Sequence, residues 1–371
     1  MKKIYFKGYY GYKNIGDDVF CVTADWICNN IWENVQAVFI GKDLPKLSNN
    51  AKVYSFNNGT IKRIFELINL IRMDKIIYFG GSLLHSRIRG LFDIKYYLNK
   101  YRFLYNKLGT IGTSVGPFKS QVDRDSIREF LKKFRFICVR DYSSLKILEE
   151  MGITEKASFC FDPAILINDV FPSLKVKKRK KDDKIKLGIS LCHYERYVGG
   201  DLRKEREREA AIESFLDEII ESNDHISEIT FFIFHGSKSV GDEKITKYFY
   251  NKYKDKIKAR IVDYTPNTEQ FCQELNSCDI IFGVRLHSGI LAYALEIPFI
   301  LVEYHKKCTE FLSTINYNNR FYIYNHRHNV DLFNNMVSTI INDEVVHGTE
   351  EMIKPEYFKK IIKDQLVKIE I

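Results

Sequence analysis

The sequence lacks any hydrophobic run that could span a membrane and any cysteine pair with the spacing of a metal site. Its longest apolar runs, such as 229–234 and 297–302, are far shorter than the roughly 20 residues of a transmembrane helix. No long apolar segment follows Met1, so no secretory signal is expected and a cytoplasmic protein is predicted. None of the 8 cysteines forms a Cys-x-x-Cys motif, which favours reduced, buried thiols over zinc sites or disulfides.

The formal net charge of +9 is modest for 371 residues and has two interpretations. Part of it lies in the basic segment 175–181, which is expected to be a solvated linker and not a nucleic-acid patch. The remainder suits an anionic substrate, or work at the inner face of an anionic membrane. The charge does not decide between these two.

The length and the hydrophobic pattern predict two domains. The chain exceeds what one hydrophobic core usually serves, and strand-like runs alternate with helical patterns in both halves. We therefore expect an α/β fold of two doubly wound, Rossmann-like domains facing a cleft, as in many glycosyltransferases. The predicted parts are an N-terminal domain at 1–170, a basic linker at 171–184, a C-terminal domain at 185–350 and a helix at 351–371 that packs back on the first domain.

The expected elements follow from apolar runs and helix-end signals. In the first half, strands are predicted at 2–6, 75–79, 110–115, 134–139 and 157–161, with helices at 17–31 and between the last two strands. That second helix is expected to start at Asp141 or Ser143 and to end at Gly152. In the second half, strands are predicted at 185–191, 228–234, 260–262, 280–283 and 299–303, with helices at 202–222, 242–254, 268–276 and 288–295.

An arginine and a histidine stand two residues apart near the C-terminal end. Arg285 and His287 follow the predicted strand 280–283 and precede the predicted helix 288–295. In an open parallel sheet, ligands bind beyond the carboxyl ends of the strands, and the start of the next helix offers N–H groups to an anion. Arg285 carries a permanent planar cation and His287 exchanges a proton near neutral pH. The pair is therefore predicted to bind an anion and to move a proton.

A glycine-rich loop at 8–18 follows the first predicted strand. Its glycine spacing is neither G-x-G-x-x-G nor a Walker A motif, so binding of a dinucleotide or nucleoside triphosphate is not expected. Asp17 is expected to cap the next helix, where it would occupy the place of a phosphate. The loop, with Asn14 and Asp17, is therefore predicted to recognise hydroxyl groups, and a plain tight turn remains the alternative.

Other predicted strand ends carry further candidates. Gly81 allows close backbone approach, for packing or for a ligand. Arg140 either reaches an anion or pairs with a neighbouring carboxylate, and Lys307 either adds a cation or is simply exposed. His193 and His235 are expected to be capping or exposed histidines, and they are the next candidates if His287 is not catalytic.

No metal or organic cofactor is expected. The histidines of 326–328 have no carboxylate or thiol nearby in the sequence, and Asp123-Arg124-Asp125 is interpreted as a helix cap and not as a metal-dependent sugar-nucleotide site.

Taken in order, these segments resemble the polysaccharide pyruvyl transferase family. The resemblance rests on Asn14-Ile15-Gly16-Asp17, the Gly80-Gly81 turn, the segment 112–117, Arg140-Asp141, Asp162-Pro163-Ala164, Arg285-Leu286-His287-Ser288 and Tyr304-x-x-Lys307. The family is similar to GT-B-like glycosyltransferases in fold. It moves pyruvate from phosphoenolpyruvate onto a sugar as a cyclic ketal.

The resemblance implies a division of labour between the two domains. It implies donor binding by Arg140, Arg285, Ser288 and Lys307, mostly in the second domain, and acceptor binding by Asn14, Asp17 and Gly81 in the first. It also implies that His287 and Arg285 carry the chemistry, with phosphoenolpyruvate as co-substrate. Two alternatives stay open: a glycosyltransferase that uses a nucleotide sugar, and a non-catalytic binding protein. The acceptor sugar, and whether it is lipid-linked, also stay open.

Overall fold

The computed structural model describes residues 1–91, 93–174, 184–222, 225–317, 322–324, 334, 337–338 and 352–371. The chain divides into two compact units. The first unit consists of Met1–Tyr12, Gly16–Leu166 and Glu356–Ile371, and the second of Lys13–Ile15 and Ile167–Pro355. The basic segment 175–181 and the histidines of 326–328 lie outside the described residues.

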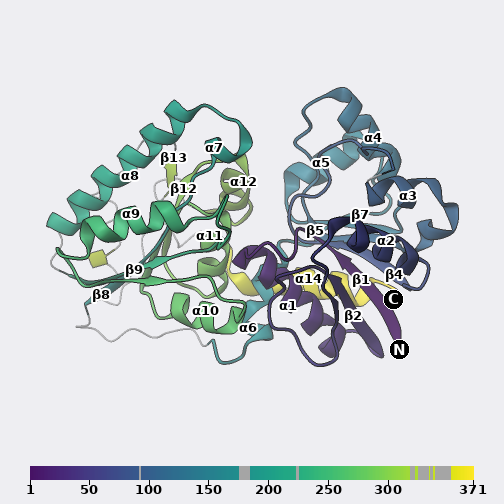
Figure 1. Ribbon diagram of the computed structural model, residues 1–371, viewed down its shortest axis with the longest axis horizontal. Helices are drawn as coiled ribbons and strands as arrows, with labels where there is room; N and C mark the ends of the chain where they lie inside the picture. The colour runs from purple at the N-terminus through teal and green to yellow at the C-terminus, as the bar shows by residue number, and fades with distance from the viewer. Residues whose placement is uncertain are drawn as a thin grey trace. The chain divides into compact units, whose positions relative to one another are not determined.

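The first unit is built on a parallel sheet of seven strands in the order β3-β2-β1-β4-β5-β6-β7. Its strands are β1 (Lys2–Lys7), β2 (Val35–Ile40), β3 (Lys52–Tyr54), β4 (Lys75–Phe79), β5 (Leu108–Thr113), β6 (Phe136–Val139) and β7 (Ala157–Phe159). The helices that flank it are α1 (Ile15–Asn30), α2 (Gly59–Leu70), α3 (Ile94–Lys100), η1 (Arg102–Lys107), α4 (Gln121–Leu131), α5 (Tyr142–Glu150), η2 (Pro163–Leu166) and α14 (Pro355–Lys368) (Figure 1). The inner parts of the central strands, such as 4–6 in β1 and 76–79 in β4, are apolar and buried because helices cover both faces of such a sheet.

The second unit repeats this plan with six parallel strands in the order β10-β9-β8-β11-β12-β13. Its strands are β8 (Ile185–Ser190), β9 (Ile226–Phe232), β10 (Ala259–Val262), β11 (Ile280–Gly283), β12 (Phe299–Glu303) and β13 (Tyr322–Tyr324). Its helices are α6 (Ile167–Val170), α7 (Glu195–Val198), α8 (Leu202–Ser222), α9 (Glu243–Tyr253), α10 (Thr268–Asn276), α11 (Leu286–Ala294) and α12 (Lys306–Thr314).

The C-terminal helix α14 belongs, except for its first residue, to the first unit. The ring of Phe358 stacks on Phe161 with 4.0 Å between centroids, and the indole N–H of Trp32 donates to the carbonyl of Leu366 at 2.9 Å. The C-terminal helix therefore packs against the core of the first unit, to which the first strand also belongs. Among the helices that the structure describes, none has both the length and the apolar character needed to cross a membrane.

The capping residues in the sequence predicted some helix ends correctly, and other predicted helix ends were wrong. The Asp141 carboxylate accepts the N–H of Ser144 at 2.7 Å, and Gly152 takes a φ of +70°, so both ends of α5 lie where the sequence predicted them. The prediction for Asp17 was wrong, because α1 begins at Ile15 and Asp17 lies inside its first turn. An acidic residue is still favourable there, since it faces the positive end of the helix dipole.

Strand order reverses at one place in each sheet. It reverses between β1 and β4 in the first unit and between β8 and β11 in the second. In open α/β sheets, ligands bind outside the carboxyl ends of the strands at such a switch point. The segments after β1 and β4, and those after β8 and β11, are therefore the places to look for a site.

Candidate functional site

Arg285 and His287 lie at the switch point of the second sheet. β11 ends at Gly283, Arg285 holds the N-cap position of α11 with φ −64° and ψ 128°, and His287 is already in the first turn of the helix. Both side chains are partly buried. The helix α11 therefore begins two residues earlier than the sequence predicted. As a result, His287 lies on a rigid helix, near its N-terminus.

The guanidinium group of Arg285 is held by Asp242, the residue that precedes α9. Arg285 Nε lies 3.2 Å from Asp242 Oδ1 and 3.1 Å from Oδ2, and Nη2 also donates to Oδ1. Asp242 is fully buried and accepts the N–H of His235 at 3.0 Å as well. Burial alone would lower the pKa of Arg285, but the Asp242 carboxylate outweighs it and raises the pKa above its ordinary value. Asp242 thus fixes one edge of the permanently charged guanidinium group of Arg285. This role of Asp242 was not predicted from the sequence.

Asn14 lies in the second unit and not in the first, where the sequence placed it. It forms an antiparallel bridge with His235, the Ile15 N–H donates to Phe234 O at 2.9 Å, and the Gly236 N–H donates to Lys13 O at 2.8 Å. The segment Lys13–Ile15 is therefore joined to the end of β9, beside the His235 backbone that binds Asp242. Asn14 and Arg285 come together in one unit.

Ser288 and Lys307 follow β11 and β12 as predicted, but in different settings. Ser288 is fully buried, and its hydroxyl donates to the carbonyl of Arg285 at 2.6 Å. A Cβ on Gly283 would lie 2.0 Å from that hydroxyl oxygen, so the tight turn requires glycine. Lys307 is in the first turn of α12, where its N–H donates to Nδ1 of His305 at 3.1 Å. Their roles toward a donor stay predictions.

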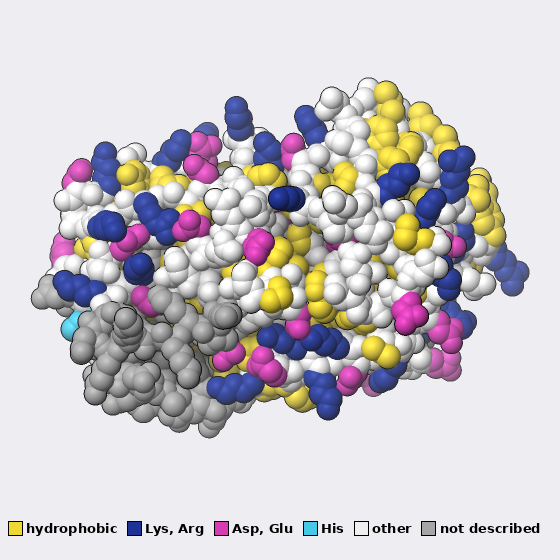
Figure 2. Space-filling view, turned by 90° about the horizontal axis from the view of Figure 1, so that it is seen from below, with side chains coloured by type: hydrophobic (Ala, Val, Ile, Leu, Met, Phe, Trp, Pro, Cys, Tyr) yellow, Lys and Arg dark blue, Asp and Glu magenta, His cyan; other side chains and the backbone are white. Residues whose placement is uncertain are grey.

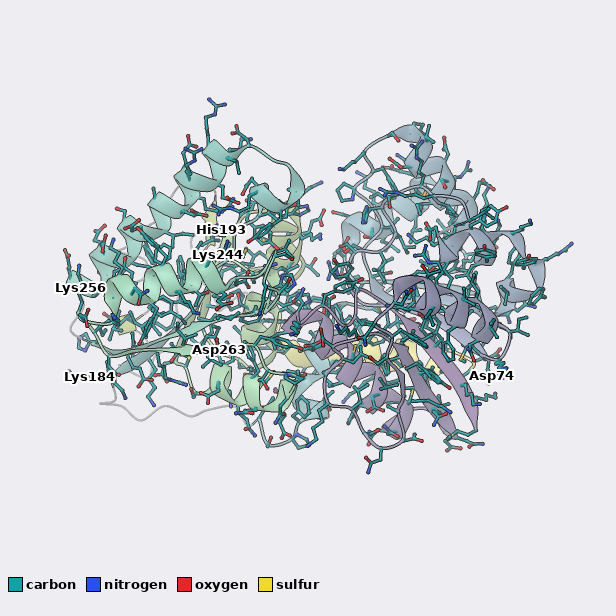
Figure 3. The ribbon with its side chains drawn as sticks, viewed as in Figure 1. Asp74, Lys184, His193, Lys244, Lys256 and Asp263 are labelled. Atoms are coloured by element: carbon teal, nitrogen blue, oxygen red, sulfur yellow. The ribbon has the colours of Figure 1, made fainter. Side chains whose placement is uncertain are left out.

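His193, which follows β8 and is labelled in Figure 3, forms a hydrogen bond with Glu209 of α8. Ligand atoms of His193, Glu205 and Glu209 lie within 4.8 Å of one another, which is close enough for a metal ion. The carboxylates already have a cation, however, because Arg196 donates to Glu205 and approaches Glu209 at 3.7 Å. Burial alone would raise the pKa of Glu205, but hydrogen bonds, chiefly from Arg196, outweigh burial and lower the pKa below its ordinary value. An ion-pair network explains this cluster better than a metal site.

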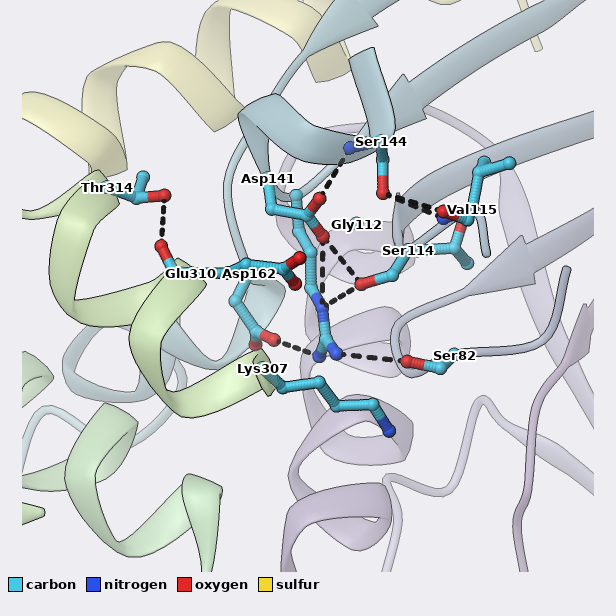
Figure 4. A network of polar contacts seen from close by, with 12 residues as sticks. Ser82, Gly112, Ser114, Val115, Asp141, Ser144, Asp162, Lys307, Glu310 and Thr314 are labelled. Atoms are coloured by element: carbon cyan, nitrogen blue, oxygen red, sulfur yellow. Dashed lines mark hydrogen bonds and ion pairs between the residues drawn. The ribbon is translucent and has the colours of Figure 1, made fainter. Parts of the chain in front are cut away.

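In the first unit, Arg140 belongs to a buried polar network with Ser114 and Asp162, which are labelled in Figure 4. It is 8% exposed, and it donates to Asp162 Oδ2 at 2.8 Å, to the hydroxyl of Ser114 at 2.8 Å and to that of Ser82 at 3.3 Å. Asp141 lies 4.0 Å away. Two carboxylates thus surround one guanidinium, so an arriving anion would meet more negative than positive charge. Donor binding by Arg140 stays a prediction, with weaker support than for Arg285.

Replacing Asp162 with alanine is expected to destabilise the protein by about 3–5 kcal/mol, because it removes the closer of the two carboxylates that pair with the buried Arg140. The matched control is Glu150→Ala, which removes a partly exposed partner of Arg124 and should cost less than about 1 kcal/mol. Thermal unfolding of the full chain measures both. Equal midpoints for the two variants would show that the Arg140 network carries little stability.

The two neighbouring glycines after β4 differ in what requires them. Gly80 has a φ of +69°, and a Cβ there would lie 2.5 Å from the ring of Phe20, so packing demands glycine. Gly81 has a φ of +72° but no atom within 4 Å of the Cβ position, so space remains beside its backbone. The packing interpretation therefore applies to Gly80, and a ligand beside Gly81 stays a prediction.

A basic cavity of about 910 Å³ opens in the first unit, beyond the Gly81 turn and beside the start of α4. Its lining includes the cations Arg87, Arg89 and Lys119. Asp123 also lines it, accepting the N–H of Arg87 at 2.9 Å and the hydroxyl of Ser120 at 2.8 Å. Ser120, and not the Asp-x-Asp segment, caps α4, which corrects the sequence prediction.

A family model of polysaccharide pyruvyl transferases matches residues 14–306, which is most of the chain. The match includes Asn14, Asp17, Gly81, Arg140, Arg285, His287 and Ser288 and ends one residue before Lys307. No curated protein matches the sequence.

Several solved structures are similar over nearly the full chain. The S. aureus MnaA–UDP co-structure has a TM-score of 0.63 at 12% identity, covering 99% of this chain and 95% of that one. A putative UDP-N-acetylglucosamine 2-epimerase from Listeria monocytogenes has a TM-score of 0.61 at 11% identity, with 100% and 97% covered. The UDP-GlcNAc 2-epimerase from Neisseria meningitidis bound to UDP-GlcNAc has 0.59 at 10% identity, with 100% of both chains covered. At such identities the similarity shows the fold alone, and it confirms the predicted GT-B-like class with two parallel-sheet α/β domains.

Proposed function

The chain belongs to the polysaccharide pyruvyl transferase family. From that premise we propose that it transfers pyruvate from phosphoenolpyruvate onto a hexose of a bacterial surface polysaccharide or of its lipid-linked precursor. The product is a cyclic ketal, and phosphate is released. The observation that carries the proposal is the Arg285-x-His287 pair at the switch point of the second sheet.

In this proposal the donor binds at the start of α11. Asp242 holds Nε and Nη2 of Arg285, so the remaining edge of the guanidinium group is the one that meets the carboxylate or phosphate of phosphoenolpyruvate. The first N–H groups of α11 add a partial positive charge. Lys307 and Ser288 are proposed as further donor ligands, and Arg140 as a second arginine.

His287 is proposed as the proton carrier. The methylene carbon of phosphoenolpyruvate accepts a proton and becomes a methyl group, which leaves a cationic centre at the neighbouring carbon. One sugar hydroxyl attacks that carbon and loses its proton, phosphate leaves as the C–O bond breaks, and a second hydroxyl attacks and loses its proton in turn. An imidazole suits both the acid and the base step at neutral pH.

The acceptor is proposed to contact Asp17 and Gly81 of the first unit. Asn14 is proposed to bind an acceptor hydroxyl from the second unit, beside the segment that fixes Asp242. The three cations of the basic cavity support an acceptor with an anionic part, such as a phosphate-linked carrier. No metal or organic cofactor takes part in this scheme.

The test is release of inorganic phosphate from phosphoenolpyruvate in the presence of a panel of free and lipid-linked glycosides. We expect phosphate in a one-to-one ratio with a product heavier by a ketal-linked pyruvate, measured by mass spectrometry. Release of a nucleotide from a nucleotide sugar, with no turnover of phosphoenolpyruvate, would establish the glycosyltransferase alternative instead. Binding of phosphoenolpyruvate without turnover on any glycoside would favour a binding protein.

A further inference from the structure

Helix α2 carries an unusual apolar face. Ile61, Ile64, Ile68 and Ile71 recur at helical spacing, and each is between 53% and 64% exposed. We call these four residues the isoleucine face. The opposite side of the same helix is buried through Glu66, Asn69 and Leu70. The exposed residues are therefore not the core-facing side of an amphipathic helix but a second apolar side that the first unit leaves uncovered.

The apolar surface continues onto the segment that follows α3. Tyr101 is 42% and Phe103 57% exposed, and their rings lie 5.8 Å apart. The ammonium group of Lys107, at the end of η1, donates to Ile71 O at 2.9 Å and to Met73 O at 2.7 Å, which joins η1 to the end of α2. Hydrophobic side chains also gather at the upper right of the face shown in Figure 2, over the first unit.

Exposed cations flank these apolar residues in the sequence. Between 59 and 107 the sequence has ten lysine and arginine residues and three acidic ones. One of the acids, Glu66, is buried and paired with Lys7. Arg72, Lys100 and Arg102 are exposed beside the apolar residues. On the rest of the face in Figure 2, by contrast, acidic and basic side chains are interspersed.

We propose that the isoleucine face, together with Tyr101 and Phe103, docks the protein onto the surface of an anionic lipid bilayer. Branched aliphatic side chains enter the boundary of the acyl chains, aromatic rings sit at the level of the headgroups, and arginine and lysine bind the lipid phosphates. A second copy of the chain fits this surface less well. A two-fold interface would bring Arg72, Lys100 and Arg102 of both copies together, and like charges would repel.

Vesicle flotation with the full-length protein tests the proposal, and it is independent of the proposed reaction because no turnover is measured. We expect binding to phosphatidylcholine vesicles that contain about one third phosphatidylglycerol, weaker binding to phosphatidylcholine alone, and a loss of binding as salt rises. The double variant Ile64→Ser/Ile68→Ser should bind at least about ten-fold more weakly. The variant Arg72→Gln/Arg102→Gln should lose the preference for anionic lipid.

The matched control is Val198→Ser/Val367→Ser, which removes two exposed branched side chains outside the isoleucine face. It should bind vesicles as the unchanged protein does. All four isoleucines are exposed, so thermal unfolding should be nearly unchanged in the test variant, and the single variants Ile64→Ser and Ile68→Ser provide intermediate cases. Equal vesicle binding by the test and control variants would overturn the proposal. A dimer in analytical ultracentrifugation that Ile64→Ser/Ile68→Ser dissociates, with no vesicle binding by the unchanged protein, would assign the face to self-association.

Discussion

Replacing His287 with glutamine is expected to lower turnover about 10²–10⁴-fold, the usual contribution of general acid–base catalysis. Glutamine keeps a hydrogen-bonding side chain at the start of α11 but does not exchange a proton near neutral pH. Affinity for phosphoenolpyruvate should therefore change little. Steady-state kinetics separates the two effects, and the pH dependence of turnover should lose the limb that depends on His287.

His225→Gln is the matched control for this variant. His225 is exposed and lies just before β9, at the edge of the sheet opposite to the switch-point loops. The same substitution there should leave rate and pH profile intact. If His287→Gln also kept near-normal turnover and the same profile, the proton carrier would have to be another residue, with His193 and His235 the next candidates.

The sheets were predictable from the sequence because most of their strands are continuous apolar runs. β11 and β12 are buried at every position, and β8 is buried at every position except Lys186. Two strands of the first unit, β2 and β3, were missed. β3 has only three residues, none of them buried, whereas β2 is an apolar run that was overlooked. The helix α2 was missed because its isoleucines face outward while a glutamate and an asparagine are buried, which obscures the helical hydrophobic pattern.

The place of the site was predictable, but its supporting contacts were not. Arg285 and His287 follow an apolar run directly, so sequence order alone placed them beyond the carboxyl end of a strand, at the start of the next helix. The partner of Arg285 is Asp242, 43 residues earlier, and only the pairing of β8 with both β9 and β11 brings them together. The same holds for Asn14. From the sequence, its loop was assigned to the first domain. In the structure, Asn14 pairs with His235, which follows β9 in the second unit.

The second large effect is expected from Arg285→Lys, which should raise the KM for phosphoenolpyruvate roughly 10–100-fold. A guanidinium group can hold Asp242 by one edge and an anion by the other, whereas a lysine ammonium is a single point charge that cannot present both forks. Loss of one charge-assisted hydrogen bond, at about 1.5–3 kcal/mol, gives a change of this size. Because Asp242 is fully buried, lysine is expected to stay with that carboxylate and to abandon the donor.

Arg260→Lys provides the control. Arg260 pairs with Glu228 at 2.9 Å and Glu274 at 2.8 Å, at a partly exposed position of the same sheet, so the same chemical change there should leave the KM unaltered. Isothermal titration with phosphoenolpyruvate measures affinity without turnover, and thermal unfolding shows whether Arg285→Lys also disturbs the fold. An unchanged donor affinity in Arg285→Lys would mean that Asp242 occupies the arginine fully. Arg285 would then position the start of α11, and donor binding would rest on Lys307, Arg140 and the helix N-terminus.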